Sequence, residues 1–320
     1  MDFGVATLTR GALGNRQGYL AAAEAAERLG YGFISVNDHI VVPRDIASRY
    51  PYSESGEWAA RTAGECLDQL AALAFLAART ERLRLLTSVM VVPQRHPVLT
   101  AKMLATIDVL SAGRLIVGCG VGWLKEEFEA VGAPDFAERG RVTDEFLAAF
   151  RELWTKDEPA YAGKHVSFSD VLFYPKPLQK PHPPIWIGGE SAAALRRTIE
   201  FADAWYPGNN SQTKPLDTPV RVAAGIAGLR PALEAAGRDP ATLEVALLVQ
   251  DYFEWGAHKI QDGSARRLFT GGSADMLEDA QALEDVGVQH VALRLGGAGA
   301  EDCVARIERF GAEVIAEVRG

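Results

Sequence analysis

Two neighbouring residues, Asp38 and His39, have side chains that could transfer a proton. They directly follow a predicted buried strand at residues 31–37. An imidazole titrates close to neutral pH, and an adjacent carboxylate could orient it for general acid-base catalysis. The alternative is a structural pair in which the two side chains only satisfy each other, and for an isolated His next to an Asp this is the commoner arrangement.

A second candidate is the glycine turn made by Gly188 and Gly189, which Ser191 follows at the start of a predicted helix. Such a turn offers free backbone N–H groups and the positive end of the helix dipole to a phosphate. An ordinary helix start with Ser191 as its N-cap has the same sequence. Taken alone, the motif favours this simpler explanation.

Small and hydroxyl residues follow two further predicted strands. Ser88 ends the first, and Gly120 and Gly122 follow the second. The carboxyl ends of parallel strands are where α/β proteins admit ligands, although glycines in tight turns need no ligand. The remaining histidines lack any such context, and no group of residues has metal-ligand spacing.

The element that positions these residues is a strand, helix and strand unit at residues 83–123. Pro97 suits the first turn of a helix, apolar residues recur at helical spacing up to Leu110, and the Ser-Ala-Gly of 111–113 ends the pattern. Two strands joined by a crossover helix pair in parallel with a right-handed connection.

The rest of the chain repeats this unit. Eight predicted strands alternate with helices, at 3–8, 31–37, 83–89, 115–117, 185–187, 204–206, 243–249 and 289–293. The pattern favours a (β/α)₈ TIM barrel, formed as one domain by residues 1–320, with insertions at the C-terminal mouth of the strands. The candidates named above would converge there, together with Asp251.

Two long insertions, at 40–64 and 250–272, are predicted at this mouth, and a hairpin is predicted at 158–173 outside the repeat. The first insertion contains Tyr50, Tyr52 and Trp58, and an irregular segment of that length is either functional or disordered. We expect it to form a lid or a pocket wall.

Composition excludes several classes of partner. The formal net charge of −9 argues against nucleic acid and anionic membranes, which need clustered positive charge. There is no secretory signal and no apolar run of about 18 residues. The three cysteines lack metal or redox spacing, which fits a reducing compartment. These features predict a soluble cytoplasmic protein with a small-molecule substrate.

Four segments in order carry a resemblance to a known family: SVNDHIVVP, ERLRLLTSVMVVPQRHPVLTAKMLATIDVLSAGRLIVGCGVGW, PLQKPHPPIWIGGES and EFADAWYP. They resemble the bacterial luciferase-like family, and most closely its branch that uses the deazaflavin coenzyme F420. The likeness runs from the first strand to about Pro207 and is looser beyond it.

The resemblance implies roles for individual residues. Asp38 and His39 match the pair beside the reactive face of the flavin-like ring. Ser88 and Val89 match a place where the family often has a non-prolyl cis peptide bond behind the ring, and the ring would lie against the strands that end near Gly120 and Gly122. The phosphate-binding turn is matched by Gly188, Gly189, Glu190 and Ser191.

One departure concerns Trp123. In the deazaflavin sugar-phosphate dehydrogenases of this fold, a glutamate that donates a proton follows the glycine matched by Gly122. Trp123 here disfavours a sugar phosphate and favours an apolar or aromatic substrate, in a pocket that Tyr50 and Trp58 would share. Simple packing under the nearby loop is an equal alternative for Trp123.

These observations lead us to expect an oxidoreductase that transfers a hydride between coenzyme F420 and a small organic substrate, as a homodimer. The first alternative is an FMN-dependent monooxygenase that uses O₂ and receives reduced flavin from a partner reductase. Two other classes stay open: a non-catalytic flavin-binding protein, and a redox-free barrel enzyme that acts on a phosphorylated metabolite.

Overall fold

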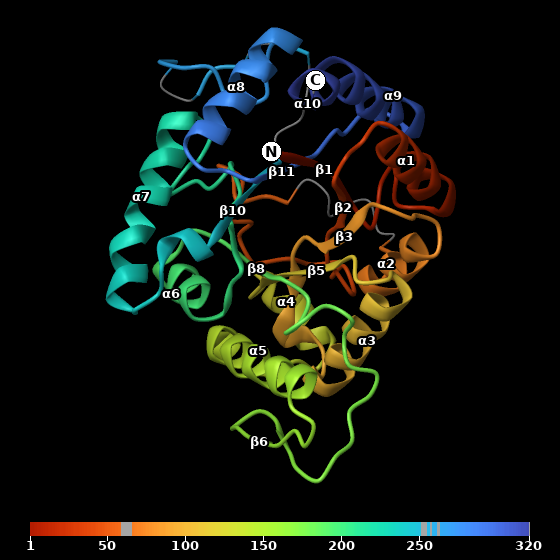
Figure 1. Ribbon diagram of the computed structural model, residues 1–320, viewed down its shortest axis with the longest axis vertical. Coiled ribbons are helices and arrows are strands. Elements are labelled where there is room, and N and C mark those ends of the chain that lie inside the picture. The colour runs from red at the N-terminus through yellow and green to blue at the C-terminus, as the bar shows by residue number, and fades with distance from the viewer. Residues whose placement is uncertain (59–65, 251–254, 257, 261–262, 320) are drawn as a thin grey trace.

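A computed structural model describes residues 1–58, 66–250, 255–256, 258–260 and 263–319. Eight parallel strands form a closed barrel with helices outside it (Figure 1). In barrel order they are β1 (Asp2–Thr7), β2 (Phe33–Val36), β3 (Arg84–Thr87), β5 (Leu115–Gly120), β8 (Ile185–Gly188), β9 (Ala204–Tyr206), β10 (Glu244–Val249) and β11 (His290–Leu293). The predicted TIM barrel is therefore confirmed.

Two strand pairings close the barrel. β1 pairs with β11 in the register Val5↔Leu293, and β3 pairs with β5 in the register Leu85↔Leu115. The two-residue strand β4 (Met90–Val91) continues the line of β3 and pairs with the end of β5. A closed barrel leaves no exposed sheet edge, and it brings all eight carboxyl ends to one mouth.

The strands are apolar on both faces because one face lies in the barrel interior and the other lies under the helices. One set of side chains fills the barrel interior: Phe33, Leu86, Ile116, Trp186, Ala204, Tyr206, Ala246 and Ala292. The alternate residues pack outward against the helices in a second, larger core. In β2 all four residues are buried. This two-sided burial explains why the strands are near-continuous apolar runs in the sequence.

The helices that follow the strands cover the barrel. They are α1 (Arg16–Arg28), α2 (Gln69–Ala77), α3 (Pro97–Leu110), α5 (Arg139–Thr155), α6 (Ala192–Phe201), α7 (Pro219–Ala235), α8 (Ser273–Asp285) and α9 (Ala300–Phe310). The bounds of α3 agree with the prediction from Pro97 and Leu110. Ser191 caps α6 by accepting a hydrogen bond from the Ala194 N–H, as its position before the helix predicts.

Three segments differ from the sequence prediction. The sequence predicts only a loop between Trp123 and a helix at about 138–154, but a short helix, α4 (Lys125–Ala130), lies there; its six residues are too few to show helical periodicity. The sequence predicts a helix at 65–78; α2 begins at Gln69 after the Asp68 cap, and Glu65 lies outside the described residues. The sequence predicts one closing helix at 301–318, but a π turn at Gly311–Ile315 interrupts it before α10 (Ala316–Arg319).

The predicted hairpin is present outside the barrel as the antiparallel pair β6 (Tyr161–Ala162) and β7 (Ser167–Phe168). Within the part of the chain that the structure describes, no helix is both long and apolar enough to cross a membrane.

Candidate functional site

The floor of the mouth is formed by Val89, which packs on the apolar interior of the barrel. The Ser88–Val89 peptide bond is cis, as the resemblance led us to expect. A Cβ on Gly120 would lie 2.6 Å from Val89 Cγ2, and one on Gly188 would lie 3.2 Å from Val89 Cγ1. The strand ends around Val89 must therefore be glycine or close to it in size, and this gives both glycines a packing function that needs no ligand.

Ser88 is held at the mouth by a second strand end. Its hydroxyl lies 2.9 Å from the phenol oxygen of Tyr206, at the end of β9. Tyr206 is completely buried, and burial raises its pKa above the ordinary range. The phenol stays neutral at any physiological pH, so it can serve Ser88 as donor or acceptor.

His39 is oriented by a carboxylate that is distant in sequence. Its Nδ1 lies 3.0 Å from Oε2 of Glu127, on α4, and the Glu127 side chain is 1% exposed. The other oxygen, Oε1, accepts the backbone N–H groups of Ile40 at 2.6 Å and Val41 at 3.2 Å. Glu127 thus fixes both the imidazole and the chain that follows it.

The ionisation of Glu127 sets the tautomer of this imidazole. Burial alone would raise the Glu127 pKa, but the hydrogen bonds from His39 and from the Ile40 amide outweigh it and lower the pKa below the ordinary value. An ionised carboxylate only accepts, so Nδ1 must carry a proton. No hydrogen bond from Nε2 to any described residue is found, which leaves this nitrogen able to exchange a proton with a bound molecule.

Asp38 has a different partner from the one expected. Its carboxylate forms a bidentate ion pair with Arg95, at 2.6 and 2.8 Å, and accepts the Val91 N–H at 2.9 Å. The prediction that Asp38 orients His39 is therefore wrong. Adjacent residues at a strand end point to opposite sides, so Asp38 anchors the segment after the cis bond while His39 turns toward α4.

The predicted pocket residues Trp58, Trp123 and Tyr50 form one aromatic cluster over His39. The rings of His39 and Trp58 have centroids 4.6 Å apart. Trp58 meets Trp123 edge to face at 5.5 Å, and Trp123 meets Tyr50 at 5.0 Å. The structure brings together three residues that the sequence separates by up to 73 positions, counted from 50 to 123.

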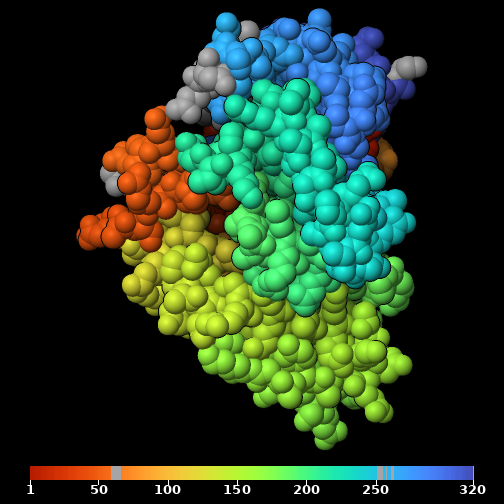
Figure 2. All heavy atoms as spheres, turned by 90° about the vertical axis from the view of Figure 1, so that its left-hand side faces the viewer, coloured from red at the N-terminus to blue at the C-terminus, as the bar shows by residue number. Residues whose placement is uncertain are grey.

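The segment that carries these aromatics is irregular over its described part, residues 40–58, and forms a rim of the mouth. Figure 2 shows it in orange, standing out beside a hollow that the yellow and green segments also border. Glu126, next to Glu127 on α4, accepts the N–H groups of Ala47 at 2.8 Å and Ser48 at 2.9 Å. The short helix that sequence analysis missed therefore holds both His39 and the rim.

Gly122 is required by its backbone. Its φ of +78° lies in the left-handed region, and a Cβ there would meet Val91 and Phe128 at 2.6 and 2.7 Å. Trp123 is thus turned toward the aromatic cluster by a tight glycine turn.

The glycine turn after β8 has the geometry of an anion cradle. Gly189 has a φ of +103°, and the first-turn amides of α6 other than Ala194 have no intrahelical partner. Glu190 is turned away from solvent and accepts the Gly208 N–H at 2.9 Å, which ties this turn to the loop after β9. Burial raises the Glu190 pKa.

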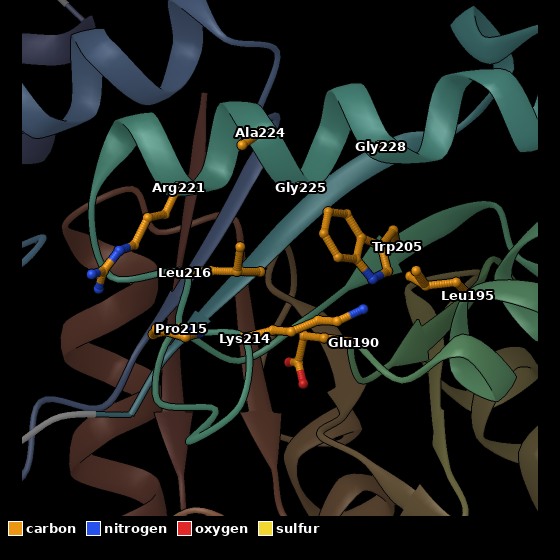
Figure 3. A pocket seen from close by; sticks show the side chains of 10 residues that line it. All are labelled: Glu190, Leu195, Trp205, Lys214, Pro215, Leu216, Arg221, Ala224, Gly225 and Gly228. Carbon is orange, nitrogen blue, oxygen red and sulfur yellow. The ribbon is translucent and has the colours of Figure 1, made fainter.

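A cleft of about 580 Å³ lies beside this turn, between α6 and α7 (Figure 3). Its walls are the apolar side chains of Leu195, Trp205 and Leu216 and the small residues of α7, and Glu190, Lys214 and Arg221 stand at its edge. In the figure the Lys214 chain runs just above Glu190. None of the lining residues belongs to the aromatic cluster, so this cleft is separate from the hollow at His39.

Sequence reasoning missed Glu127, Arg95 and the buried Arg10, whose guanidinium carbon lies 4.0 Å from the ring centroid of Trp58. The acidic pair at 126–127, which begins three residues after Trp123, was the available signal for Glu127. Asp251, expected at the mouth, lies outside the described residues. Among the described residues no cluster of His, Cys, Asp or Glu could hold a metal ion.

The geometry can therefore support proton transfer at His39 Nε2, above an apolar floor and below an aromatic cover. The profile of the luciferase-like monooxygenase family matches residues 1–313. An uncharacterised protein of Mycobacterium tuberculosis is 30% identical over 298 residues, covering 92% of this chain and 93% of that protein.

Two other proteins differ in the cofactor that they are named for. An FMNH₂-dependent dimethylsulfone monooxygenase of Pseudomonas putida is 40% identical over 138 residues, which is 42% of this chain and 38% of that enzyme. The solved structure of an F420-dependent secondary alcohol dehydrogenase superposes with a TM-score of 0.75 at 16% identity, covering 98% of each chain. The second likeness shows the fold alone. With its family profile matched over nearly the whole length, the chain belongs to the luciferase-like monooxygenase family.

Proposed function

We propose that the protein is an oxidoreductase that transfers a hydride between coenzyme F420 and a small organic substrate in the mouth of the barrel. The observation that carries the proposal is the pair formed by His39 and Glu127, which engages Nδ1 and leaves Nε2 without a hydrogen bond to any described residue, beside the ring of Trp58. Hydride transfer at a carbonyl or alcohol carbon makes or consumes one proton on oxygen, and this nitrogen can hold that proton.

The residues around the floor fit a flat ring system. The glycines at the ends of β5 and β8 bring no side chain to the floor around Val89, and in this proposal a ring stacks there beside Ser88, His39 and the backbone at Gly120 and Gly122. In this proposal Asp38 contributes by fixing the chain after the cis bond through Arg95. The cofactor would supply the hydride chemistry, and the protein would orient and enclose it.

The phosphate would bind at Gly188, Gly189, Glu190 and Ser191. The left-handed Gly189 permits close approach of the backbone, and the α6 amides that lack intrahelical partners can donate to an anion. The adjoining cleft, with Lys214 at its edge, gives room for a chain beyond the phosphate. Coenzyme F420 has an anionic tail beyond its phosphate, whereas FMN ends at its phosphate, and the room beyond the turn is why we favour F420.

His39 would donate a proton to a substrate carbonyl oxygen or accept one from an alcohol. The Glu127 carboxylate accepts the proton of His39 Nδ1 and holds the ring in one orientation. Trp58, Trp123 and Tyr50 would exclude water and form an apolar wall for the substrate. With Trp123 after Gly122, the pocket favours an apolar or aromatic body over a sugar.

A second candidate is an FMN-dependent monooxygenase that receives reduced flavin from a partner reductase. It is favoured by the 40% identity, over 138 residues, to an enzyme named as FMNH₂-dependent. The same mouth would hold the flavin, and the same turn would hold its phosphate.

A fluorescence titration with both cofactors tests the proposal. Tight quenching of F420 fluorescence with weak FMN binding would support the hydride-transfer function, and the reverse would support the monooxygenase. If neither cofactor binds, both proposals fail. Binding without turnover in a broad screen of alcohols, ketones and aldehydes would instead indicate a flavin-binding protein without catalysis.

The phosphate assignment has its own test. Gly189→Asp adds charge and bulk at the turn and should weaken cofactor binding by at least about 10-fold, since it opposes an anion with a like charge. Gly189→Ala is the matched control, because it imposes the same strain at φ +103° without the charge. Equal affinity in the Asp and Ala variants would remove the assignment.

We also propose that the protein is a homodimer. Exposed apolar side chains gather on α3 and on the segment after β7, at Leu99, Leu110, Leu172, Tyr174 and Leu178. The two regions are adjacent, because Lys102 of α3 contacts the Tyr174 carbonyl and Asp108 binds Gln179. Analytical ultracentrifugation with Leu110→Glu and Leu172→Glu variants tests whether this patch buries a second copy.

A further inference from the structure

A buried cation in the mouth, Arg10, has no ion-pair partner among the residues that the structure describes. It follows β1, is 5% exposed, and its guanidinium nitrogens Nε and Nη1 form no hydrogen bond within that part of the chain. The loop that carries it is held by the Thr9 N–H, which donates to Asn37 Oδ1 at 2.6 Å. A buried charge without hydrogen bonds is costly, and native proteins seldom leave one except at a functional place.

The groups around Arg10 do not neutralise it. One face of the guanidinium stacks on Trp58 at 4.0 Å. Burial raises the pKa of Cys66 and the pKa of Tyr50, so both are uncharged near neutral pH. The described carboxylates at this mouth already have partners, since Glu127 is bound by His39 and Asp38 is bound by Arg95.

A second arginine adds to the positive charge. Arg294 directly follows β11, the strand that pairs with β1, and its backbone N–H donates to the Val249 carbonyl at 3.0 Å. Neither arginine has a carboxylate partner among the described residues. Burial lowers the Arg10 pKa, and the charge of Arg294 lowers it further. An anion between them would be stabilised by both.

The position of the two arginines separates them from the proposed cofactor phosphate. The phosphate turn follows β8, whereas β1 and β11 lie on the other side of the barrel, and the floor between them is Val89. Trp58 contacts both the Arg10 guanidinium, at 4.0 Å, and the His39 ring, at 4.6 Å. An anion held by Arg10 would therefore lie close to His39, because both residues contact the ring of Trp58.

We propose that Arg10 and Arg294 bind an acidic group of the substrate, so that the substrate is an organic anion, a carboxylate or sulfonate carried on an apolar or aromatic body. The aromatic cluster receives the body, and the arginines receive the charge. This deepens the proposed function, since it names the substrate class of the same mouth. The proposal rests on the proposed function for where the reaction takes place, but binding of the anion by the arginines does not depend on that function.

The test measures binding of benzoate and of its neutral isostere benzamide to the cofactor-loaded protein by isothermal titration calorimetry. Benzoate should bind at least about 10-fold more tightly, because a charge-assisted pair in a buried place is strong. Arg10→Met should abolish this preference and leave cofactor affinity unchanged. Arg28→Met, on the exposed surface of α1, is the control and should keep the preference.

Two further measurements keep the test decisive. Arg10→Lys retains a charge but not the planar fork, so it should keep part of the preference if Arg10→Met fails to fold. Thermal unfolding without cofactor should show stabilisation by benzoate and not by benzamide, which separates this proposal from failure of the cofactor assignment. The proposal is overturned if wild type does not distinguish the two probes, or if Arg10→Met distinguishes them equally well. Loss of cofactor binding in Arg10→Met, with the anion preference intact, would assign the arginine to the cofactor instead.

Discussion

Replacing Glu127 by Gln should impair proton transfer by His39 while leaving the imidazole itself in place. In wild type, Glu127 Oε1 accepts the Ile40 and Val41 N–H groups at 2.6 and 3.2 Å, and the carbonyl oxygen of the amide can still accept both. The rim should therefore keep its position. The amide NH₂ would face His39 Nδ1 in place of Oε2, which lies 3.0 Å away. Nδ1 must then accept, and the proton moves to Nε2.

The magnitude follows from the lost contact. A hydrogen bond to a charged group contributes roughly 1.5 to 3 kcal/mol. Since about 1.36 kcal/mol corresponds to a tenfold change in rate, loss of this contact corresponds to a change of about 10- to 100-fold. Turnover at neutral pH should fall about 10- to 100-fold, the usual effect of removing an orienting partner.

Stability should change with pH in a defined direction. The folded pKa of Glu127 lies below its ordinary value of 4.5, so its carboxylate stabilises the fold at higher pH. That contribution is complete above the ordinary pKa and is lost as the pH falls through the lowered folded value. The difference in free energy of unfolding between wild type and Glu127→Gln should therefore be largest near neutrality and shrink in acid.

The assay is steady-state turnover from pH 5 to 9, with urea unfolding of both proteins at pH 7 and pH 4. Glu129→Gln is the control, because it removes a charge from the same helix at a side chain that is 63% exposed and far less constrained. If Glu127→Gln keeps the wild-type pH profile and turnover, then Glu127 does not act through His39 and the assignment is refuted.

Three other outcomes are expected. His39→Ala should lower turnover by about 10²- to 10⁴-fold, as removal of a general acid or base does, with cofactor affinity little changed; near-normal turnover on a verified substrate would make His39 structural. The segment 44–63, of which residues 44–58 are described, should close over the mouth, because Tyr50, Tyr52 and Trp58 need an apolar surface. Trypsin should then cleave after Arg44 and Arg49 more slowly when cofactor and substrate are saturating. Equal cleavage rates with and without them would exclude a lid. Gly120→Ala should lower the free energy of unfolding by about 1 to 3 kcal/mol through overpacking on Val89, whereas Gly228→Ala, with no atom within 4 Å of the new Cβ, should not; equal urea midpoints would contradict the packing argument.

The barrel was predictable because its signals are local. Pro97 and the Ser-Ala-Gly at 111–113 mark the two ends of α3, and Ser191 caps α6 from the position next to it. Strands buried on two faces are apolar without interruption, which the sequence shows directly. Once eight such units alternate, parallel closure places every strand end at one mouth, so Ser88, Gly120 and Gly188 could be assigned to it without a structure.

The partners of the site residues were not predictable, because they depend on contacts across the barrel. His39 and Glu127 are 88 positions apart, and Asp38 and Arg95 are 57 apart. Because Asp38 and His39 are adjacent in sequence, we predicted that Asp38 orients His39. Consecutive side chains at a strand end point in different directions, and here His39 binds the carboxylate of Glu127 while Asp38 binds the guanidinium of Arg95. Glu127 was hidden further by its helix, since the six residues of α4 are too short to be periodic.

The sequence by itself determined the fold class, the family resemblance and that Ser88, Gly120 and Gly188 lie at the mouth, because these follow from local periodicity and from motifs read along the chain. Only the tertiary structure decided which of these side chains are paired and which are left without a partner. Arg10 shows the difference most clearly. Nothing in its neighbours along the chain indicates a buried cation, and its lack of a partner follows from where β1, Trp58 and Arg294 meet once the barrel has closed.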